Sequence, residues 1–593
     1  MMKFKKRIFL MGVLGFSSLA FSQSATKFQG TVDTNWNNAA NWNNGLPDAT
    51  KNVLILNHCV VPSGSNVTCA KLNIATIFPN AGIIVQNNAT LTIASGGELA
   101  INDTGQFTIM PNAAIIMNNG AVTLKHPGCL YVKSDATGSG SILGYNSINS
   151  IDPNGHGLGT AEVESYISIG KYHYVSSPIA NAISSMLTSQ NVYSFDTDNN
   201  HGVWNNFWQP FSGTLAVGEG YTAFSDVVSK LTFDGLFNFG TKSVDIYRND
   251  VNAPTDGGYG GGWNLIGNPY PSGVNINSFI TVNSAAIGPD AVYFWDDDGS
   301  RGTGYTNADY SSHNGITGTA SVNGHMPSGI ISSGQGFFVR AASAGTSQVN
   351  FTEAQRVSTN NNFFRISNDV NVSKFNLHVT SEIGLQNDIA FAFTEYSNDG
   401  LDDLDVEKLV GNSNLALYST MDNKAYSIQM LSSFNGNAKT IPIAIKTSQT
   451  GNFTFTVSQF ENMGILPVSL TDLLTNTTYD LNPQSSITVN IVQTGTISNR
   501  FILNFGNTSV NAVKNIVNTA KPGVIAYNGH LQINLNGLNN AEVVVFNLHG
   551  QLISQQTLSA GQNSELNHIY NNGCYIVKMV SGGNVFTQKV IIN

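Results

Sequence analysis

Two loops rich in carboxylate and amide side chains are the first candidates for chemistry in this sequence. One runs Asp196-Thr197-Asp198-Asn199-Asn200, and the other runs Asp296-Asp297-Asp298-Gly299-Ser300. Oxygen ligands at alternate positions can wrap a hard cation, so a structural calcium is predicted at Asp196 and Asp198, and a second at Asp296 and Asp298. Neither loop has the complete EF-hand pattern, because the glycine is misplaced and the distal glutamate is missing. The alternative is an acidic hairpin loop in which Asp and Asn only supply turn geometry. The sequence indicates no other cofactor.

Aromatic side chains close to these loops are candidates for binding sugars. Trp204 and Trp208 lie in a polar segment, where a planar ring can stack on a sugar and nearby amides can hydrogen-bond to it. Trp263 and Trp295 lie inside apolar runs, which favours burial in a core. The sequence therefore gives Trp204 and Trp208 as the glycan-binding candidates.

Catalytic motifs are absent from the sequence. It contains no H-E-x-x-H, G-x-S-x-G or P-loop string. The repeat at residues 83–132 carries only Glu98, Asp103 and Lys125 as charged groups, which poorly supply an acid, a base and a cation site. We therefore expect a protein that is not an enzyme. A polysaccharide-degrading enzyme remains an alternative, because active sites need not be linear in sequence.

The elements that position these residues are expected to be β-strands. Charged residues make up 11% of the chain, far below the ~25% of average soluble proteins. The hydrophobic content of 41% argues against disorder, and the 58 glycines favour turns over helices. The net charge is −10, with no basic tract beyond the N-terminal segment. This charge pattern argues against nucleic-acid binding.

A short repeat runs through residues 83–132. Apolar pairs recur every eight residues, or seven in one step, beginning at Ile83, Leu91, Leu99, Phe107, Ile115, Val122 and Leu130. Turn clusters of Asn, Asp, Ser and Gly separate them. This spacing predicts a β-solenoid-like domain over residues 23–160, with inward side chains stacked coil on coil. A meander in a β-sandwich is the alternative.

A longer internal repeat indicates two duplicated β units in residues 165–360. Four pairs of segments correspond in the same order: Tyr172–Pro178 with Trp263–Pro269, Val192–Asp198 with Val292–Asp298, Val217–Tyr221 with Ser333–Phe337, and Leu231–Phe233 with Val349–Phe351. The offset between partners grows along the chain, as expected if the loops of the second unit are longer.

The next region, residues 361–507, alternates apolar β-formers with turn signals and is predicted to be a β-sandwich. One short helix is expected at Leu401–Leu409, after the capping types Ser397, Asn398 and Asp399. Residues 508–522 have the composition of a linker to a last domain at 523–593.

Four cysteines occur, at Cys59, Cys69, Cys129 and Cys574. Cys59 and Cys69 flank a turn and would close a short loop if they formed a disulfide in an oxidising compartment; the sequence leaves that open. The other two lie in apolar runs and are expected to be buried small hydrophobes.

The N-terminus has the pattern of a secretory signal peptide. Lys3, Lys5, Lys6 and Arg7 precede an apolar run from Ile8 to Phe21, and small residues stand before Gln23. We expect residues 1–22 to be removed. No other stretch approaches the ~18 apolar residues of a membrane-spanning helix, so no span is expected in the mature chain.

The last seventy residues read as a small antiparallel β-domain. Strand-forming runs at Val543–Leu552, Gly573–Val580 and Gln588–Asn593 are separated by polar turns. Gly550, Gly573, Tyr575, Val577 and Lys589, with Val590, occupy the motif positions of a known family. On these residues the segment resembles the C-terminal sorting domain of the Bacteroidetes type IX secretion system. Cys574 departs from the aliphatic residue usual there.

The resemblance implies that the domain is a secretion signal, and it implies no catalytic residue. A sorting domain of this kind is an Ig-like β-sandwich read by the type IX secretion machinery and then removed. The body would be released or anchored to surface lipopolysaccharide. We therefore expect an all-β protein, secreted to the outer cell surface, with an adhesive or structural role. A glycan-binding accessory protein that contacts extracellular glycans is the alternative.

Overall fold

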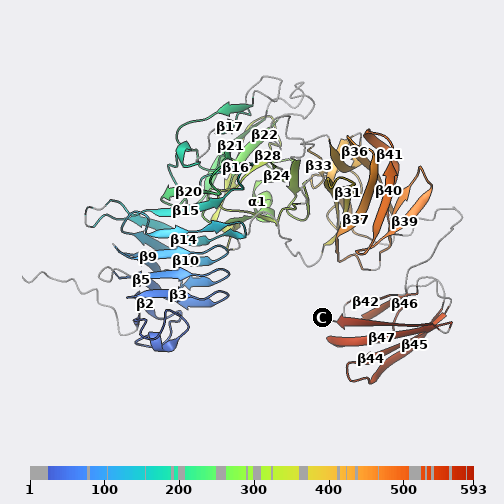
Figure 1. The fold of residues 1–593 in the computed structure, drawn as a ribbon, viewed down its shortest axis with the longest axis horizontal. Coiled ribbons are helices and arrows are strands. Elements are labelled where there is room, and N and C mark those ends of the chain that lie inside the picture. Colours follow the sequence, from blue (N-terminus) through green and yellow to red (C-terminus); the bar gives the residue numbers. More distant parts are fainter. Residues whose placement is uncertain are drawn as a thin grey trace, which may run out of the picture.

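The chain is described by a computed structural model at residues 25–75, 81–102, 104–153, 155, 157–187, 192–197, 207–248, 262–288, 291–297, 299, 309–321, 325–358, 372–409, 414–422, 424–434, 438–464, 466–506, 523–527, 530–535, 540–559, 564–582 and 584–592. β-Strands dominate this part of the chain, as its composition predicts (Figure 1). The one α-helix within these ranges is α1 (Ile276–Asn283). The predicted signal peptide and the predicted linker, 508–522, lie outside the described residues.

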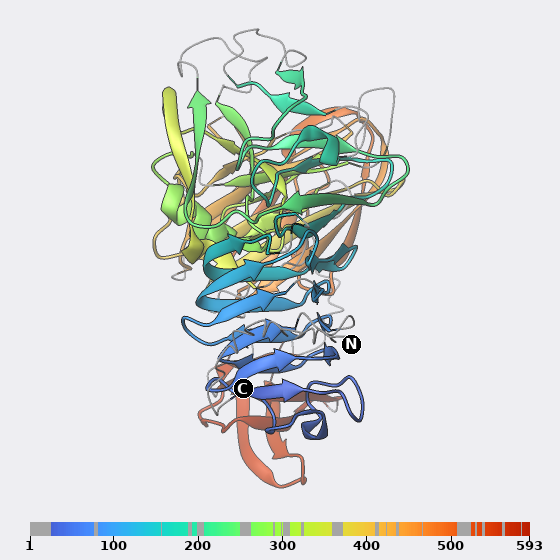
Figure 2. The same cartoon turned by 90° about the vertical axis from the view of Figure 1, so that its left-hand side faces the viewer.

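A three-sided β-solenoid forms the N-terminal part, as the eight-residue repeat predicts (Figure 2). Each apolar pair is one side of a coil, so three pairs complete a turn, and strands of one side begin at residues 58, 82, 106 and 130. That side stacks in parallel β3 (His58–Val61), β6 (Gly82–Val85), β9 (Gln106–Ile109), β11 (Leu130–Val132) and β15 (Ala161–Tyr166). The second side consists of β4 (Asn66–Cys69), β7 (Thr90–Ile93) and the first parts of β10 (Ala114–Leu124) and β14 (Ser141–Ser150). The third consists of β1 (Thr26–Phe28), β2 (Asn52–Ile55), β5 (Lys71–Ile74), β8 (Glu98–Ile101) and the last parts of β10 and β14.

Inward side chains of the solenoid form continuous stacks. On the first side the stack consists of Val61, Val85, Ile109, Val132 and Val163, each paired in register with the next and fully buried. β-Branched side chains suit this position because they pack well on a pleated surface. The stacked apolar side chains make the solenoid a filled core along its whole length.

Aromatic residues close the N-terminal end of the solenoid. The ring centroid of Trp42 lies 4.8 Å from that of Trp36 and 5.0 Å from that of Phe28. The indole N–H of Trp42 donates to the carbonyl of Trp36 at 2.7 Å, and the backbone N–H of Trp36 donates to the carbonyl of Val60 at 2.9 Å. This cap covers strand edges that would otherwise be free to pair with another chain.

Two β units of the same topology follow the solenoid. The first has the strand order β16 (Tyr172–Val175), β19 (Tyr221–Phe224), β17 (Tyr193–Phe195), β18 (Trp208–Pro210). The second has the matching order β22 (Trp263–Gly267), β28 (Gly336–Arg340), β24 (Val292–Asp296), β25 (Asp309–His313). Each unit adds a separate antiparallel pair: β20 (Lys230–Gly235) with β15, and β29 (Gly345–Phe351) with β21 (Lys242–Arg248). The chain therefore contains the internal duplication that its sequence repeat predicts.

The two units contact each other through equivalent residues. The N–H of Ser176 donates to the carbonyl of Gly334 at 2.7 Å, and the N–H of Gly267, the counterpart of Ser176, donates to the carbonyl of Gly218 at 2.8 Å. Reciprocal contacts of this kind define an approximate two-fold relation between the units. Gly336 lies against Tyr174 in the same contact, and its counterpart Gly220 lies against Leu265.

Replacing Gly336 by alanine is expected to destabilise this contact. A methyl group at Gly336 would lie 2.9 Å from Cβ of Tyr174 and 2.8 Å from its carbonyl carbon. Overpacking of this kind typically costs about 1–3 kcal/mol. Thermal unfolding of the purified chain should show a lower Tm, and an unchanged Tm would show that the units do not press together here.

The longer loops of the second unit form additional structure. Helix α1 begins after Asn275, whose side chain accepts from the N–H of Ser278 at 2.9 Å, and buries Ile276, Phe279 and Ile280. Four short elements lie in these insertions or directly after the unit: β23 (Gly273–Asn275), β26 (Gly318–Thr319), β27 (Ile330–Ile331) and β30 (Arg356–Val357). The one-turn helix η5 (Glu353–Gln355) precedes β30.

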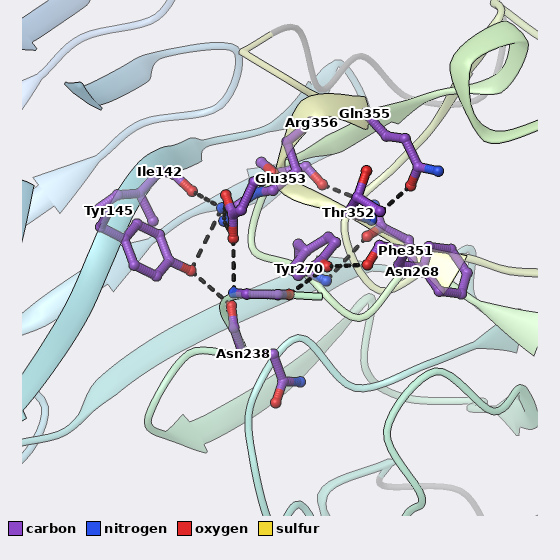
Figure 3. A network of polar contacts seen from close by, with 12 residues as sticks. Ile142, Tyr145, Asn238, Asn268, Tyr270, Phe351, Thr352, Glu353, Gln355 and Arg356 are labelled. Atoms are coloured by element: carbon purple, nitrogen blue, oxygen red, sulfur yellow. Dashed lines mark hydrogen bonds and ion pairs between the residues drawn. The ribbon is translucent and has the colours of Figure 1, made fainter. Parts of the chain in front are cut away.

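Arg356 joins the second unit to the solenoid (Figure 3). Its side chain has no solvent exposure. It donates to the carbonyl of Ile142 on β14 at 2.5 Å, and to both carboxylate oxygens of Glu353 at 3.0 and 2.8 Å. The guanidinium carbon lies 4.8 Å from the ring centroid of Tyr145 on β14 and 4.7 Å from that of Tyr270 in the second unit. A buried, paired cation thus fixes these two parts to each other.

Residues 372–506 form one eleven-stranded sheet that curls around a common core. Its strands are β31 (Ser373–Ser381), β32 (Gln386–Thr394), β33 (Val406–Glu407), β34 (Leu415–Met421), β35 (Lys424–Ser432), β36 (Lys439–Thr447), β37 (Gly451–Glu461), β38 (Val468–Asp472), β39 (Thr477–Leu481), β40 (Ser486–Ile491) and β41 (Gly495–Phe505). Phe501 on β41 and Phe455 on β37 have ring centroids 5.4 Å apart, although five strands separate β41 from β37 along the sheet. The predicted sandwich therefore takes the form of a single sheet whose halves face each other.

The second unit packs against the outer side of this curled sheet. Trp263, Tyr293 and Phe338 share a buried apolar cluster with Ala390 and Ile428 of the sheet. Arg340 pairs with Glu407 at 3.3 Å, and the amide of Asn376 donates to the carbonyl of Gly318 at 3.0 Å. This interface combines an apolar centre with polar contacts.

The predicted helix at Leu401–Leu409 is wrong. The segment is a turn followed by β33. Asp405 accepts from the N–H of Asp402 at 2.9 Å and from that of Met430 at 2.8 Å, and burial raises its pKa to about 6. The aspartates therefore bond to turn and strand backbone in place of starting a helix.

Candidate functional site

The C-terminal domain consists of two facing sheets. One contains β42 (Gly523–Tyr527), β43 (His530–Asn534) and β46 (Ser564–Glu565). The other has the order β45 (Leu552–Ser559), β44 (Asn540–Asn547), β47 (Gly573–Ser581), β48 (Asn584–Ile592). Leu531, Ile533, Val543, Val577 and Met579 are fully buried between them. Burial alternates along β44 and β47 because successive side chains of a strand point to opposite faces of a sheet.

The motif residues of this domain have different roles in the structure. Gly550 has φ +77° in the turn between β44 and β45, a conformation that favours glycine. Gly573 begins β47, and Val577 lies in the core. Tyr575 is half-buried; its hydroxyl donates to the carbonyl of Asn571 at 2.9 Å. Lys589 is exposed on β48, opposite Ile576.

The second predicted calcium loop is held by contacts within the protein. The Asp296 carboxylate accepts from the hydroxyl of Ser321 and from Nδ1 of His325, the latter at 2.7 Å. Asp297 accepts from the N–H of Tyr172 at 2.7 Å and from that of Gly299 at 2.8 Å. Asp198 and Asp298 lie outside the described residues; Asp196 directly follows β17, and the described part of the first loop ends at Thr197. Within the described ranges no three His, Cys, Asp or Glu side chains group as a metal site. The calcium site stays a prediction.

The Asp296–His325 pair responds to pH. The hydrogen bond to Asp296 raises the pKa of His325 above its usual value. A raised histidine pKa stabilises the fold below the unfolded pKa of about 6.5, and this contribution is lost as the pH rises through the folded pKa. The pair therefore holds the segment at His325 more firmly in mildly acidic solution.

Of the two tryptophans predicted to bind glycans, the structure describes Trp208 and does not describe Trp204. Trp208 is half-buried on β18, with its ring centroid 5.1 Å from that of Phe195, 5.6 Å from that of Tyr174 and 6.3 Å from that of Phe338. Trp263 is buried and Trp295 is half-buried in the same cluster. Trp208 thus belongs to an aromatic cluster with a partly exposed side, and its role in sugar binding stays a prediction.

All four cysteines are free thiols. Cys59 lies on β3 and Cys69 on β4, so they occupy different sides of the solenoid, and each is fully buried in its own inward stack. The disulfide that the sequence left open is therefore not formed. Burial raises the pKa of both thiols well above the usual value. Cys129 is fully buried, as expected, whereas the expectation for Cys574 is wrong, because that cysteine is partly exposed on β47.

One polar constellation was missed by the sequence reasoning. Nδ1 of His378 on β31 contacts the carboxylate of Asp388 on β32, and Nε2 of His378 lies 3.1 Å from the hydroxyl of Thr380. His378 and Asp388 face each other in the β31–β32 register, a signal that a predicted hairpin could have given. β31 is paired on both sides, with β32 and β37, so its backbone N–H groups are engaged in the sheet and do not form an oxyanion hole.

The tail defines the class of this protein. A family described as "Secretion system C-terminal sorting domain" matches residues 527–593, in agreement with the fold and motif positions above. The chain is therefore a substrate of the type IX secretion system, secreted to the cell surface or beyond it.

The body of the chain defines its family. Residues 27–505 match the family described as "Domain of unknown function (DUF8693)", and the chain belongs to that family. No curated protein matches the chain. In the part of the chain that the structure describes, no helix has the length and apolar character needed to cross a membrane.

Proposed function

We propose that residues 27–505 act outside the cell as a rigid adhesive or structural module that the sorting domain delivers. The observation that carries this proposal is the buried linkage between successive parts. Arg356 ties the solenoid to the second unit, and the cluster around Trp263 and Tyr293 ties that unit to the curled sheet. Parts of a chain move relative to each other unless their interface is large and apolar or otherwise fixed. A body held in this way keeps an adhesive surface at a fixed distance from its anchor, which on this proposal is surface lipopolysaccharide.

The test is attachment of cells that lack the chain. Attachment to surfaces and to neighbouring cells should fall, and expression of the full chain should restore it. A matched control chain without residues 27–505, but with the N-terminal segment and the tail, should be exported and should not restore attachment. Wild-type attachment in the deletion strain would contradict the adhesive role. A screen for polysaccharide cleavage by the purified chain tests the accompanying proposal that the body is not an enzyme.

Glycan binding is a second candidate, favoured by the partly exposed aromatic cluster at Trp208. If this cluster stacks on sugars, Trp208→Ala should weaken retention on a polysaccharide that holds the native chain by about twofold to tenfold, because one aromatic contact contributes roughly 0.5–1.5 kcal/mol. Affinity electrophoresis measures this retention. The matched control is Trp36→Phe in the solenoid cap, which should leave retention unchanged. Absence of native retention on a broad glycan panel would count against this candidate.

A further inference from the structure

The sorting domain has one sheet face that nothing described covers. Along β47 and β48 alternate side chains point into the core: Val577, Met579, Val590 and Ile592 are buried. The side chains between them point outward, and two are strongly exposed apolar groups, Val585 at 57% and Ile591 at 59%. We call this surface the outer face; its outward residues include Glu542, Val544, Phe546, Leu552, Gln555, Thr557, Cys574, Ile576, Lys578, Val580, Val585, Thr587, Lys589 and Ile591.

Lys589 is the motif residue whose side chain is accessible to a partner on the outer face. Gly550 and Gly573 present no side chain, Val577 is in the core, and Tyr575 packs on the inner side against Tyr570, with ring centroids 5.4 Å apart. Those four residues determine how the domain folds. A receptor that approaches the outer face therefore meets Lys589 and its neighbours.

The outer face carries two free cations. Lys578 and Lys589 are exposed on adjacent strands, with Lys578 opposite Thr587 and Lys589 opposite Ile576, so they are diagonal neighbours. Neither forms an ion pair with another described residue. The one described acid on this face, Glu542, is bonded to the side chain of Gln555. The face is therefore apolar with a net positive centre.

We propose that the outer face is the docking surface for a protein component of the secretion machinery that presents an apolar patch with acidic side chains. Contiguous exposed apolar groups mark interaction sites, and two unpaired lysines among them select an acidic partner and reject a basic one. This inference rests on the sorting function of the domain.

Charge reversal on full-length chains tests the proposal in the producing cells. The double variant Lys578→Glu/Lys589→Glu should reduce the secreted fraction by about tenfold or more, because like charges at an interface cost several kcal/mol. A matched control, Lys71→Glu/Lys27→Glu, makes the same charge change on exposed solenoid positions and should be secreted normally. Normal secretion of the double variant would contradict the proposed docking surface. If a chain without residues 523–593 is retained in the same cells, the sorting function of the domain is still supported.

Cys574 gives a readout that does not depend on folding of a variant. It lies on the outer face opposite Ile591 and is half-buried, whereas the other three cysteines are fully buried. N-ethylmaleimide should alkylate Cys574 of the native full-length chain at least threefold more slowly when a detergent extract of outer membranes from secreting cells is added. Extract from cells without the secretion system should have no effect. Equal rates in both extracts, or protection by a higher concentration of the chain alone, would contradict the proposal.

Discussion

Replacing Arg500 by methionine is expected to lower the free energy of unfolding by about 3–5 kcal/mol, because it leaves a buried carboxylate without its partner. Arg500 on β41 donates through Nε and Nη2 to the two oxygens of Asp472 at 3.0 and 2.8 Å. Their side chains are 9% and 1% exposed. Arg500 also donates to the carbonyl of Asn490 at 2.9 Å. Calorimetric unfolding of the purified chain at neutral pH measures the loss.

The pH dependence of this variant has a definite sign. Burial alone would raise the pKa of Asp472, but hydrogen bonds from Arg500 and the N–H of Leu474 outweigh it and hold that pKa below its usual value. In the wild type this contribution is present above the unfolded pKa of about 4 and is lost as the pH falls through the folded pKa. The variant lacks the cation, so its Asp472 is neutralised more easily. The stability gap should therefore begin to narrow above pH 4, as the unpaired carboxylate of the variant takes up a proton, and should narrow further below about 4, as the wild type loses its ion pair.

A second variant separates the cost of the unpaired Asp472 charge from the cost of the packing lost with Arg500. Arg500→Met/Asp472→Asn removes both charges and should recover part of the stability lost in Arg500→Met. If the single and double variants are equally destabilised at neutral pH, the charge is not the cause and the account of this pair is wrong.

Replacing Arg356 by methionine should cost about 3 kcal/mol. The change removes donors to the buried carbonyl of Ile142 and to Ser272, and two ring contacts, with Tyr145 and Tyr270. An orphaned buried acceptor alone costs roughly 1–3 kcal/mol, and cation–π contacts add about 0.5–2 kcal/mol each. Glu353 is more than a third exposed, so water can solvate its freed carboxylate and the ion pair itself adds less.

Hydrogen exchange gives the measurement for Arg356, because the effect should be local. Amides of β14 and β30 should exchange faster in Arg356→Met, as the joint between the solenoid and the second unit opens more often. The matched control is Lys424→Met, which breaks an exposed pair with Glu407 at 2.6 Å and should change stability by less than about 1 kcal/mol. Unchanged exchange at β14 would show that Arg356 does not hold the joint.

Much of the fold could be predicted because its signals are local and periodic. The eight-residue spacing from Ile83 to Leu130 predicts the sides of the solenoid, since each apolar pair must face the same core. The corresponding segments that begin at Tyr172 and Trp263 predict the duplicated units, because they recur in the same order along the chain. Helix α1 was missed because it has only eight residues, among them β-branched Ile, Thr and Val, and depends on burial of Phe279. The predicted helix at 401–409 was wrong because its aspartates bond to turn and strand backbone.

The contacts that determine the architecture could not be predicted from sequence. Arg356 and its acceptor Ile142 are 214 residues apart, and Asp472 and Arg500 are 28 apart on neighbouring strands of the curled sheet. No local pattern marks such pairs. The C-terminal domain, in contrast, could be predicted from its sequence motif. The structure adds that most of the motif residues stabilise the fold, whereas the side chain of Lys589 projects outward.

The central claim is that the C-terminal domain carries the address of a secreted cargo. The most direct measurement is the location of the chain in the producing cells with and without residues 523–593, by immunoblot of medium, cell surface and periplasm. The full chain should be found on the surface or in the medium, and the truncated chain should accumulate in the periplasm with its body folded. Truncated chain on the surface at the level of the full chain would contradict the account.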